Sequence, residues 1–246
     1  MAKVISGWFQ WLNNSFGLNF TIFYDAFDGV RFWNGLLTTI ELSVVATIVS
    51  VIIGIAGAGA QRSRSAALRS LAQSYVQIFR NTPPLVQMYF FFFALGPSVS
   101  RVAGAAEPVL GSFGWAVVSL SLFAGAFNVE IFRSGIEAVP AATSEAAYAL
   151  GFSRLQIFFE VLLPLALRAA LPALTGNIIN LVKTTTLASA IAAPEMLFVS
   201  TQIWSDSLNV TEMMVVLLIS YNLIVSVIAV AMHRWERQLK IPGFGR

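Results

Sequence analysis

Long apolar stretches alternate with short polar segments along most of the chain. Five of these stretches are long and apolar enough to form membrane-crossing helices, and we expect the helices at residues 34–60, 69–96, 113–134, 164–187 and 213–232. Crossing a hydrocarbon layer of roughly 30 Å takes about 20 mostly apolar residues in a helix, because each backbone polar group must be satisfied within the segment. The pattern therefore predicts an all-α integral membrane protein.

Two parts of the chain lack such a stretch. The first 25 residues are rich in aromatic side chains, which favour the headgroup layer, and they carry no cleavage pattern of a signal peptide. We therefore expect residues 1–33 to form an interfacial segment, followed by a transmembrane domain over residues 34–246. Within that domain, residues 135–163 are less hydrophobic and predict a loop of two short helices hinged at Gly151.

The composition agrees with a membrane protein. Hydrophobic residues make up 57% of the chain and charged residues 11%, whereas an average soluble domain carries about 25% charged residues. The net charge of +3 does not indicate a nucleic-acid partner, because the cationic residues lie in short clusters beside apolar runs rather than along one face. Such clusters indicate how the chain is oriented in a membrane.

The cationic residues outside the expected spans fall unequally on the two sides of the membrane. One side receives Arg62, Arg64, Arg69, Arg154, Arg234, Arg237, Lys240 and Arg246. The other side receives Lys3, Arg31 and Arg101, among several acidic residues. Because cytoplasmic loops carry the excess of Lys and Arg, we expect the amino terminus outside and both the 135–163 loop and the carboxyl terminus in the cytoplasm.

Few residues are available for catalysis. The chain has no cysteine, and its single histidine, His233, stands beside Arg234, where contact with solvent or lipid headgroups is expected rather than metal binding. A membrane-embedded enzyme would have to rely on Asp and Glu alone, so we expect no catalytic residue and no metal site.

A phosphate-binding P-loop is also absent, since the only lysine followed by Ser or Thr is Lys183, preceded by Val182. Any ATP would have to bind another chain.

The 135–163 loop carries a spaced motif. It reads Glu145-Ala146-Ala147, three residues, Gly151, nine residues and then Val161-Leu162-Leu163-Pro164. The motif resembles the E-A-A-x3-G-x9-I-x-L-P signature of type I ABC importer permeases, with Val161 in place of Ile as the only difference. Helix formers precede Gly151, and we expect this glycine to provide a turn that a side chain would obstruct.

A short helix can bind another protein by placing its apolar side in a groove. The resemblance implies that the loop binds an ATPase subunit in this way. The residues implied in this coupling are Glu145, Ala146, Ala147, Gly151, Leu163 and Pro164. The alternative is an amphipathic loop that packs only against the helix ends of its own chain.

Three further segments are similar to the polar-amino-acid branch of these permeases, the histidine, glutamine and arginine uptake family. They are Asn34–Thr39, Phe79–Gln87 and Glu130–Arg133. The resemblance implies the type I importer fold with five transmembrane helices in a bacterial cytoplasmic membrane. It also implies two ATPase subunits that hold ATP and magnesium, a second permease subunit, identical or paralogous, and a periplasmic or lipid-anchored binding protein. Many relatives read Lys-Asp-Thr-Ser-Leu where this chain has Lys183 to Leu187 with Thr184, so the particular amino acid stays open.

Ionisable residues inside the spans need a partner or a water-filled cavity, because each costs about 2.5 to 3.5 kcal/mol at mid-helix. Glu130 and Arg133 are three residues apart and could form a pair on one helix. A second interpretation places polar groups along a translocation path, where a zwitterionic amino acid needs an anion and a cation. The residues expected on that path are Arg80, Gln87, Asn128, Glu130, Lys183 and Thr184.

Two alternatives to an amino acid importer are a secondary transporter and an importer of the same class with a different cargo. A secondary transporter driven by ion gradients would show inverted repeats or paired broken helices, and the two halves of the chain show no repeat. Importers of methionine, phosphate, osmolytes or metals share the loop motif, so the motif predicts an ATP-driven alternating-access mechanism but not the cargo.

Overall fold

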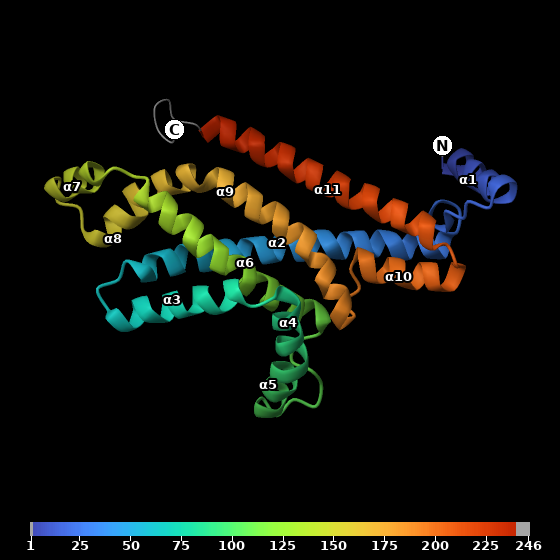
Figure 1. Ribbon diagram of the computed structural model, residues 1–246, viewed down its shortest axis with the longest axis horizontal. Coiled ribbons are helices and arrows are strands. Elements are labelled where there is room, and N and C mark those ends of the chain that lie inside the picture. Colours follow the sequence, from blue (N-terminus) through green and yellow to red (C-terminus); the bar gives the residue numbers. More distant parts are fainter. Residues whose placement is uncertain (1, 240–246) are drawn as a thin grey trace. The chain divides into compact units, whose positions relative to one another are not determined.

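The computed structural model describes residues 2–239, and in this range the chain folds into helices without any strand (Figure 1). Lys240 and Arg246, two of the basic residues expected on the cytoplasmic side, lie outside the described residues. The α-helices are α1 (Ala2–Phe16), α2 (Ala26–Gln61), α3 (Ala66–Asn81), α4 (Pro84–Tyr89), α5 (Gly96–Val102), α6 (Ser112–Glu137), α7 (Ala141–Ala149), α8 (Arg154–Gln156), α9 (Leu163–Thr184), α10 (Met196–Ser207) and α11 (Val210–Leu239). Shorter 3-10 or π segments are η1 (Thr21–Phe23), η2 (Phe90–Leu95), η3 (Ile157–Leu162) and η4 (Thr185–Ile191).

Five helical segments of the described chain are long and apolar enough to cross a membrane. They are Ala26–Gln61, Pro84–Val102, Ser112–Glu137, Arg154–Ile191 and Val210–Leu239. The apolar window of the last segment is only 17% buried, as expected for a helix that faces lipid. The predicted fold class, all-helical with five membrane helices, is confirmed.

The first two spans differ from their expected bounds. The first begins at Ala26 rather than residue 34, because the Asp25 carboxylate accepts hydrogen bonds from the backbone N–H groups of Phe27 (2.8 Å) and Asp28 (3.0 Å) and caps the helix. The second is not one helix over 69–96. Helix α3 ends at Asn81, since Thr82 is extended (φ −112°, ψ 136°) before Pro83, as residues before proline usually are.

The same segment also continues beyond its predicted end. Gly96 and Pro97 were expected to stop it, but they form the first turn of α5, which follows the π-helical turns of η2 and runs to Val102. Proline is tolerated at the first positions of a helix, where its missing N–H is not needed.

The second half of the predicted 135–163 loop is helical and continuous with the fourth span. Ser153 and Gln156 form a capping box that starts α8, and the helix then passes through η3 into α9 without a break, since Leu163 has helical backbone angles (φ −63°, ψ −45°). Ile157 and Leu162 are buried, so tertiary packing holds this turn of the helix in place although its hydrophobicity is modest.

The chain forms two compact units. Among the described residues, the first unit contains 2–45, 88–118 and 182–226, and the second contains 46–87, 119–181 and 227–239. The core of the first unit joins the beginning of α2, α10 and the beginning of α11. Its buried members are Phe32, Met196, Val199, Ile203, Met213, Val216 and Leu217.

A buried carboxyl group adjoins the core of the first unit. Glu195 is 0% exposed and caps α10 by accepting hydrogen bonds from the N–H groups of Leu197 (2.9 Å) and Phe198 (2.7 Å). The Tyr221 hydroxyl of α11 donates a third hydrogen bond to it (2.9 Å). Burial raises the pKa of Glu195, and the three donors offset part of the cost of removing the carboxyl group from water.

Glycines allow helices of the second unit to approach closely. A Cβ added at Gly57 of α2 would lie 2.3 Å from Val129 Cγ2 of α6, and one added at Gly135 of α6 would lie 2.6 Å from the carbonyl oxygen of Ala166 in α9. Small residues of this kind are typical of packed membrane helices, where backbones meet without intervening side chains. The resulting close packing positions the end of α6 against the beginning of α9.

Candidate functional site

Helix α7 carries the Glu145-Ala146-Ala147 part of the loop motif and ends at a glycine in the left-handed region. Gly151 has φ +87°, its N–H donates to the carbonyl of Tyr148 (3.0 Å), and the Phe152 N–H donates to the carbonyl of Ala147 (3.1 Å). This pair of hydrogen bonds is the Schellman motif, which ends a helix with glycine. Gly151 thus provides the predicted turn, and a side chain is disfavoured there by the positive φ angle itself, because an added Cβ would meet no atom of another residue within 4 Å.

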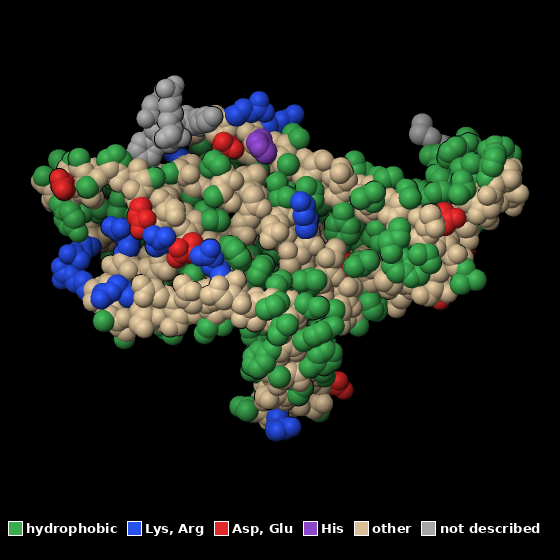
Figure 2. All heavy atoms as spheres, viewed as in Figure 1, with side chains coloured by type: hydrophobic (Ala, Val, Ile, Leu, Met, Phe, Trp, Pro, Cys, Tyr) green, Lys and Arg blue, Asp and Glu red, His purple; other side chains and the backbone are tan. Residues whose placement is uncertain are grey.

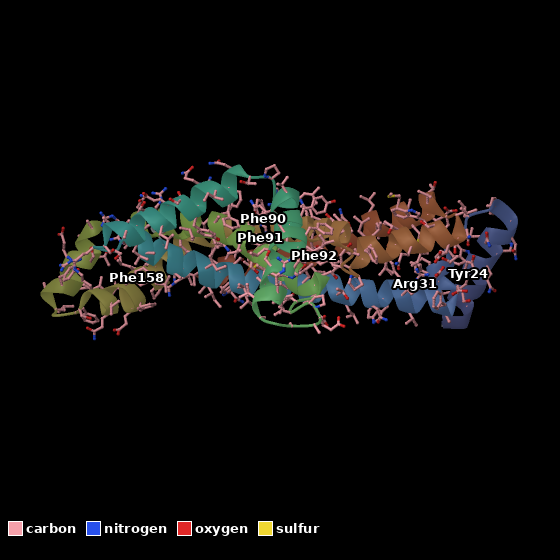
Figure 3. The ribbon with its side chains drawn as sticks, turned by 90° about the horizontal axis from the view of Figure 1, so that it is seen from below. Tyr24, Arg31, Phe90, Phe91, Phe92 and Phe158 are labelled. Carbon is pink, nitrogen blue, oxygen red and sulfur yellow. The ribbon has the colours of Figure 1, made fainter. Side chains whose placement is uncertain are left out.

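One side of α7 packs against its own unit. Ala147 is 6% exposed and belongs to a cluster formed by the end of α6, the turn η3 and the beginning of α9. The other buried members of that cluster are Ala58, Phe132, Ile136, Val139, Ile157, Leu162, Ala166, Ala170 and Leu174. Leu163 packs against the cluster and Pro164 is exposed in the first turn of α9. The turn η3 also meets α2, where a Cβ at Gly59 would lie 3.4 Å from the Phe158 ring (Figure 3).

The other side of the loop is uncovered. Glu145 and Ala146 are exposed, and so are large apolar side chains beside them: Leu150 is 78% exposed and Leu155 71%. Leu150 ends α7, which the buried Ala147 holds against its own unit, and Leu155 lies in α8 at the very beginning of the fourth span. The loop is therefore a firmly held element with an apolar and acidic surface directed away from its own chain.

A charged cluster lies along α6 of the second unit. Arg133 donates to the Glu130 carboxylate (Nη2 to Oε2, 2.9 Å) and to Glu137 (Nη1 to Oε1, 2.7 Å). Gln61, from the end of α2, donates to the other oxygen of Glu130 (3.2 Å). Arg80 of α3 approaches Glu130 at 4.0 Å. The pair predicted within one helix is thus present, and it is part of a larger group that includes Arg80.

Arg80 makes the longest ion-pair contact of this cluster. Its side chain is 41% exposed, and its guanidinium group stands over the ring of Phe127 at 5.2 Å from the ring centre. Figure 2 shows acidic and basic side chains side by side on this unit, with further basic side chains at the end that carries the turn between α2 and α3. Arg62 and Arg64 of that turn are exposed.

A pocket of about 280 Å³ opens beside the charged cluster. Arg80, Phe127, Glu130 and Ile131 line one part of it, and small residues at the end of α6, directly after α6 and in α9 line the rest: Ser134, Gly135, Ala138, Ala169, Ala170 and Ala173. This volume lies just below the roughly 300 to 1,000 Å³ of common ligand pockets, so the pocket has room only for a small molecule. It presents both a cationic and an anionic group.

The other residues expected on the path have different surroundings. Asn128 is 1% exposed, donates to Ser50 of α2 (3.1 Å) and accepts from Asn177 of α9 (2.8 Å), which ties three helices together. Gln87 is also buried and donates to the carbonyls of Phe79 (2.8 Å) and Thr82 (2.9 Å), in and directly after the last turn of α3. Their contacts are those of packing residues, and a role on the path stays a prediction.

Lys183 and Thr184 belong to the first unit. Lys183 is exposed and Thr184 is partly buried, at the junction of α9 and η4. Of the cluster residues, Gln61 was not predicted from the sequence. It follows the long apolar run of α2 directly, and a polar residue at the end of a span was the signal that could have indicated it.

Known proteins similar to this chain are transport permeases. Residues 47–240 match the family described as binding-protein-dependent transport system inner membrane component. The chain is 29% identical to the glutamate/aspartate import permease protein GltJ of Escherichia coli (strain K12), over 86% of this chain and 88% of that protein. It is 32% identical to the L-cystine transport system permease protein TcyB of Bacillus subtilis (strain 168), over 85% of this chain and 88% of that protein.

The fold is similar to that of a solved transporter. A chain in the crystal structure of an amino acid ABC transporter with histidines aligns with a TM-score of 0.72 and 26% sequence identity, covering 85% of this chain and 94% of that one. The similarity thus extends over most of the transmembrane region.

Proposed function

The chain belongs to the family of binding-protein-dependent transport system inner membrane components, and on that basis we propose that it is the permease subunit of an ATP-driven importer of a polar amino acid or a close derivative. The cargo follows from the relatives, which are named as permeases for glutamate and aspartate and for cystine. All of these substrates are amino acids with polar side chains or polar ends. Thr184, where many relatives have Asp, leaves the individual amino acid open.

The observation that carries the coupling part of the proposal is the uncovered side of the 135–163 loop. Leu150 at the end of α7 and Leu155 in α8 expose most of their side chains, Glu145 of α7 is also exposed, and the buried Ala147 holds α7 against its own unit. An apolar surface on a short, rigid helix suits binding in a groove of another protein. We assign that groove to the ATPase subunit, so ATP and magnesium bind there and this chain hydrolyses nothing itself.

The proposed assembly contains two ATPase subunits, a second permease, identical or paralogous, and an external binding protein that delivers the amino acid. Closure of the ATPases would move α7, and the packing of α7 on α6 and α9 would pass that movement to the membrane helices as a rigid-body rotation. The unequal distribution of Lys and Arg supports an amino terminus outside the bacterial cytoplasmic membrane and a cytoplasmic 135–163 loop.

The pocket beside Glu130 supports a path for a zwitterion. Arg80 can pair with a carboxylate, because its own contact with Glu130 is long at 4.0 Å. Glu130 offers a carboxylate to an ammonium group, while Arg133 and Gln61 hold it in place. The pocket therefore presents the two charges that an amino acid backbone requires.

A matched pair of tryptophan substitutions tests the coupling role. Gly151 and Gly104 both have left-handed φ angles, +87° and +65°, and a Cβ at either would meet no atom within 4 Å. Both substitutions therefore impose similar backbone strain, and at neither position does the added Cβ meet another residue of the chain. We expect Gly151→Trp to lower binding-protein-dependent uptake in proteoliposomes at least roughly ten-fold, equivalent to about 1.4 kcal/mol, and to lose the ATPase subunit on purification.

Gly104→Trp should keep both uptake and the ATPase subunit, because residue 104 lies outside the 135–163 loop. Normal uptake by Gly151→Trp would show that the loop does not contact the ATPase at this turn.

A further inference from the structure

Helix α1 has three different sides, and the first of them packs on its own unit. The ring of Phe9 stacks on Phe23 with 4.2 Å between ring centres and meets the edge of Phe20 at 5.7 Å. Asn13 donates a hydrogen bond to the Tyr24 hydroxyl (3.2 Å). These contacts hold α1 against the segment that precedes α2.

The second side is apolar and uncovered. Val4, Trp8 and Trp11 follow one another at helical spacings of four and three residues, so they share a face. Val4 is 75% exposed and each tryptophan 53%. Ile5, 46% exposed, adjoins them. No charged residue occurs between positions 4 and 16.

The third side is polar. Gln10 and Asn14 are exposed there. A hollow of about 540 Å³ separates this region of α1 from the beginning of α2, and Ser6, Gly7 and Gln10 line it together with residues 22–26, 29 and 30. Solvent can therefore reach this side without displacing any side chain.

Hydrogen bonds place α1 at the level where two spans begin. The N–H of Asn19 donates to Glu212 (2.8 Å) in the first turn of α11, and Asn209, just before α11, donates to the carbonyl of Asn19 (2.8 Å). Tyr24, which Asn13 contacts, lies two residues before α2 begins at Ala26, and Figure 3 shows it at the same end of the unit as Arg31. Arg31 pairs with Asp206 at 2.9 Å. Charged groups near the beginnings of α2 and α11, Arg31 and Glu212, indicate the boundary between hydrocarbon and water.

We propose that α1 is a membrane-surface anchor whose occupant is the lipid bilayer. Its apolar side enters the boundary between headgroups and acyl chains, while Gln10 and Asn14 face water. A lipid surface fits better than a protein partner, because paired tryptophans favour the headgroup layer and the helix is held at the level where the chain's own spans begin. The anchor fixes the depth of the first turns of α2 and α11 through Tyr24 and Asn19.

The chain contains no cysteine, so a single introduced cysteine can carry a spin label at a chosen position. Val4→Cys, Trp8→Cys, Gln10→Cys and Asn14→Cys are compared in the complete transporter, reconstituted in vesicles of phosphatidylethanolamine and phosphatidylglycerol. Collisions with oxygen, which concentrates in lipid, and with a water-soluble nickel chelate report the depth of each label. We expect the ratio of oxygen to nickel collisions to be severalfold higher at residues 4 and 8 than at residues 10 and 14.

Two outcomes overturn the anchor. Equal ratios at all four positions would mean that α1 lies wholly in water or wholly in lipid, and an immobile label at residue 8 that neither reagent reaches would mean that a protein covers the apolar side. As a second measurement, changing Trp8 and Trp11 together to Ser should reduce the ratio at a label on residue 4, and changing Gln10 and Asn14 to Ser should leave it unchanged. Label depth does not depend on transport, so the result is separate from the proposed function.

Discussion

The carboxyl groups of Glu195 and Glu130 differ in burial and in hydrogen-bond partners, and we expect different roles for them. Glu195 has no exposed surface, and its carboxylate caps α10 by accepting hydrogen bonds from two backbone N–H groups. The Tyr221 hydroxyl donates a further hydrogen bond to it. Glu130 keeps 24% of its side chain exposed, pairs with arginines and lines a pocket. The first arrangement stabilises a junction of helices, and the second leaves a charge available to a ligand.

Glu130→Gln tests the role of that available charge. The amide keeps the shape of the carboxyl group but removes the anion that an ammonium group needs, so we expect amino acid uptake and substrate-stimulated ATP hydrolysis to fall roughly ten-fold, the loss of about 1.4 kcal/mol of a charge pair. Both rates are measured in the reconstituted complex.

Glu137→Gln is the matched control, because Glu137 also pairs with Arg133 but is 57% exposed and does not line the pocket. It should retain most of the activity. If Glu130→Gln transports as well as the unchanged protein, Glu130 serves only to pair with the arginines.

Pairings distant in sequence could not be predicted at this scale. The spacing of Glu130 and Arg133 indicated their pair, because three residues bring side chains together on any helix. The contact of Gln61 with Glu130 joins residues 69 positions apart, and the contact of Tyr221 with Glu195 joins residues 26 positions apart across two helices. Such contacts depend on how the helices pack against one another. The pattern of polar residues along one sequence does not reveal that packing.

At the scale of the element, apolar length predicted which segments span the membrane, and local chemistry decided where they end. Asp25 extends the first span to Ala26, and Thr82-Pro83 divides the second. Gly96-Pro97 does not end the second span, because the chain continues from the π turns of η2 directly into α5. The Glu145 to Pro164 motif predicted the position of the turn at Gly151, but burial of Ile157 and Leu162 makes its second half part of the fourth span.

Close approach of α6 and α9 gives a test of helix packing. At Gly135 of α6 a Cβ would lie 2.6 Å from a backbone oxygen, which cannot rotate away, so Gly135→Ala should destabilise the protein by about 1 to 3 kcal/mol. At Gly176 of α9 a Cβ would meet no atom within 4 Å, so Gly176→Ala should keep or slightly raise stability. Thermal unfolding midpoints of the detergent-solubilised complex compare the two, and equal midpoints would contradict the close packing of α6 on α9.

At the scale of the whole molecule, membership in the permease family joins the two candidate sites in one function. In the proposed function the charged pocket would receive the amino acid, and the 135–163 loop would bind the partner that supplies energy. Both lie in the second unit, in which α7 packs against the ends of α6 and α9. A movement imposed on the loop therefore reaches helices that line the pocket.

The source of energy for uptake tests this function most directly. Proteoliposomes are prepared with the chain, its partner permease where one exists, the ATPase subunits and the external binding protein, and uptake of labelled polar amino acids is measured. We predict uptake that requires ATP and magnesium on the ATPase side together with the binding protein, and that persists when all ion gradients are abolished. Uptake driven by a sodium or proton gradient without ATP would contradict the proposal and identify a secondary transporter instead.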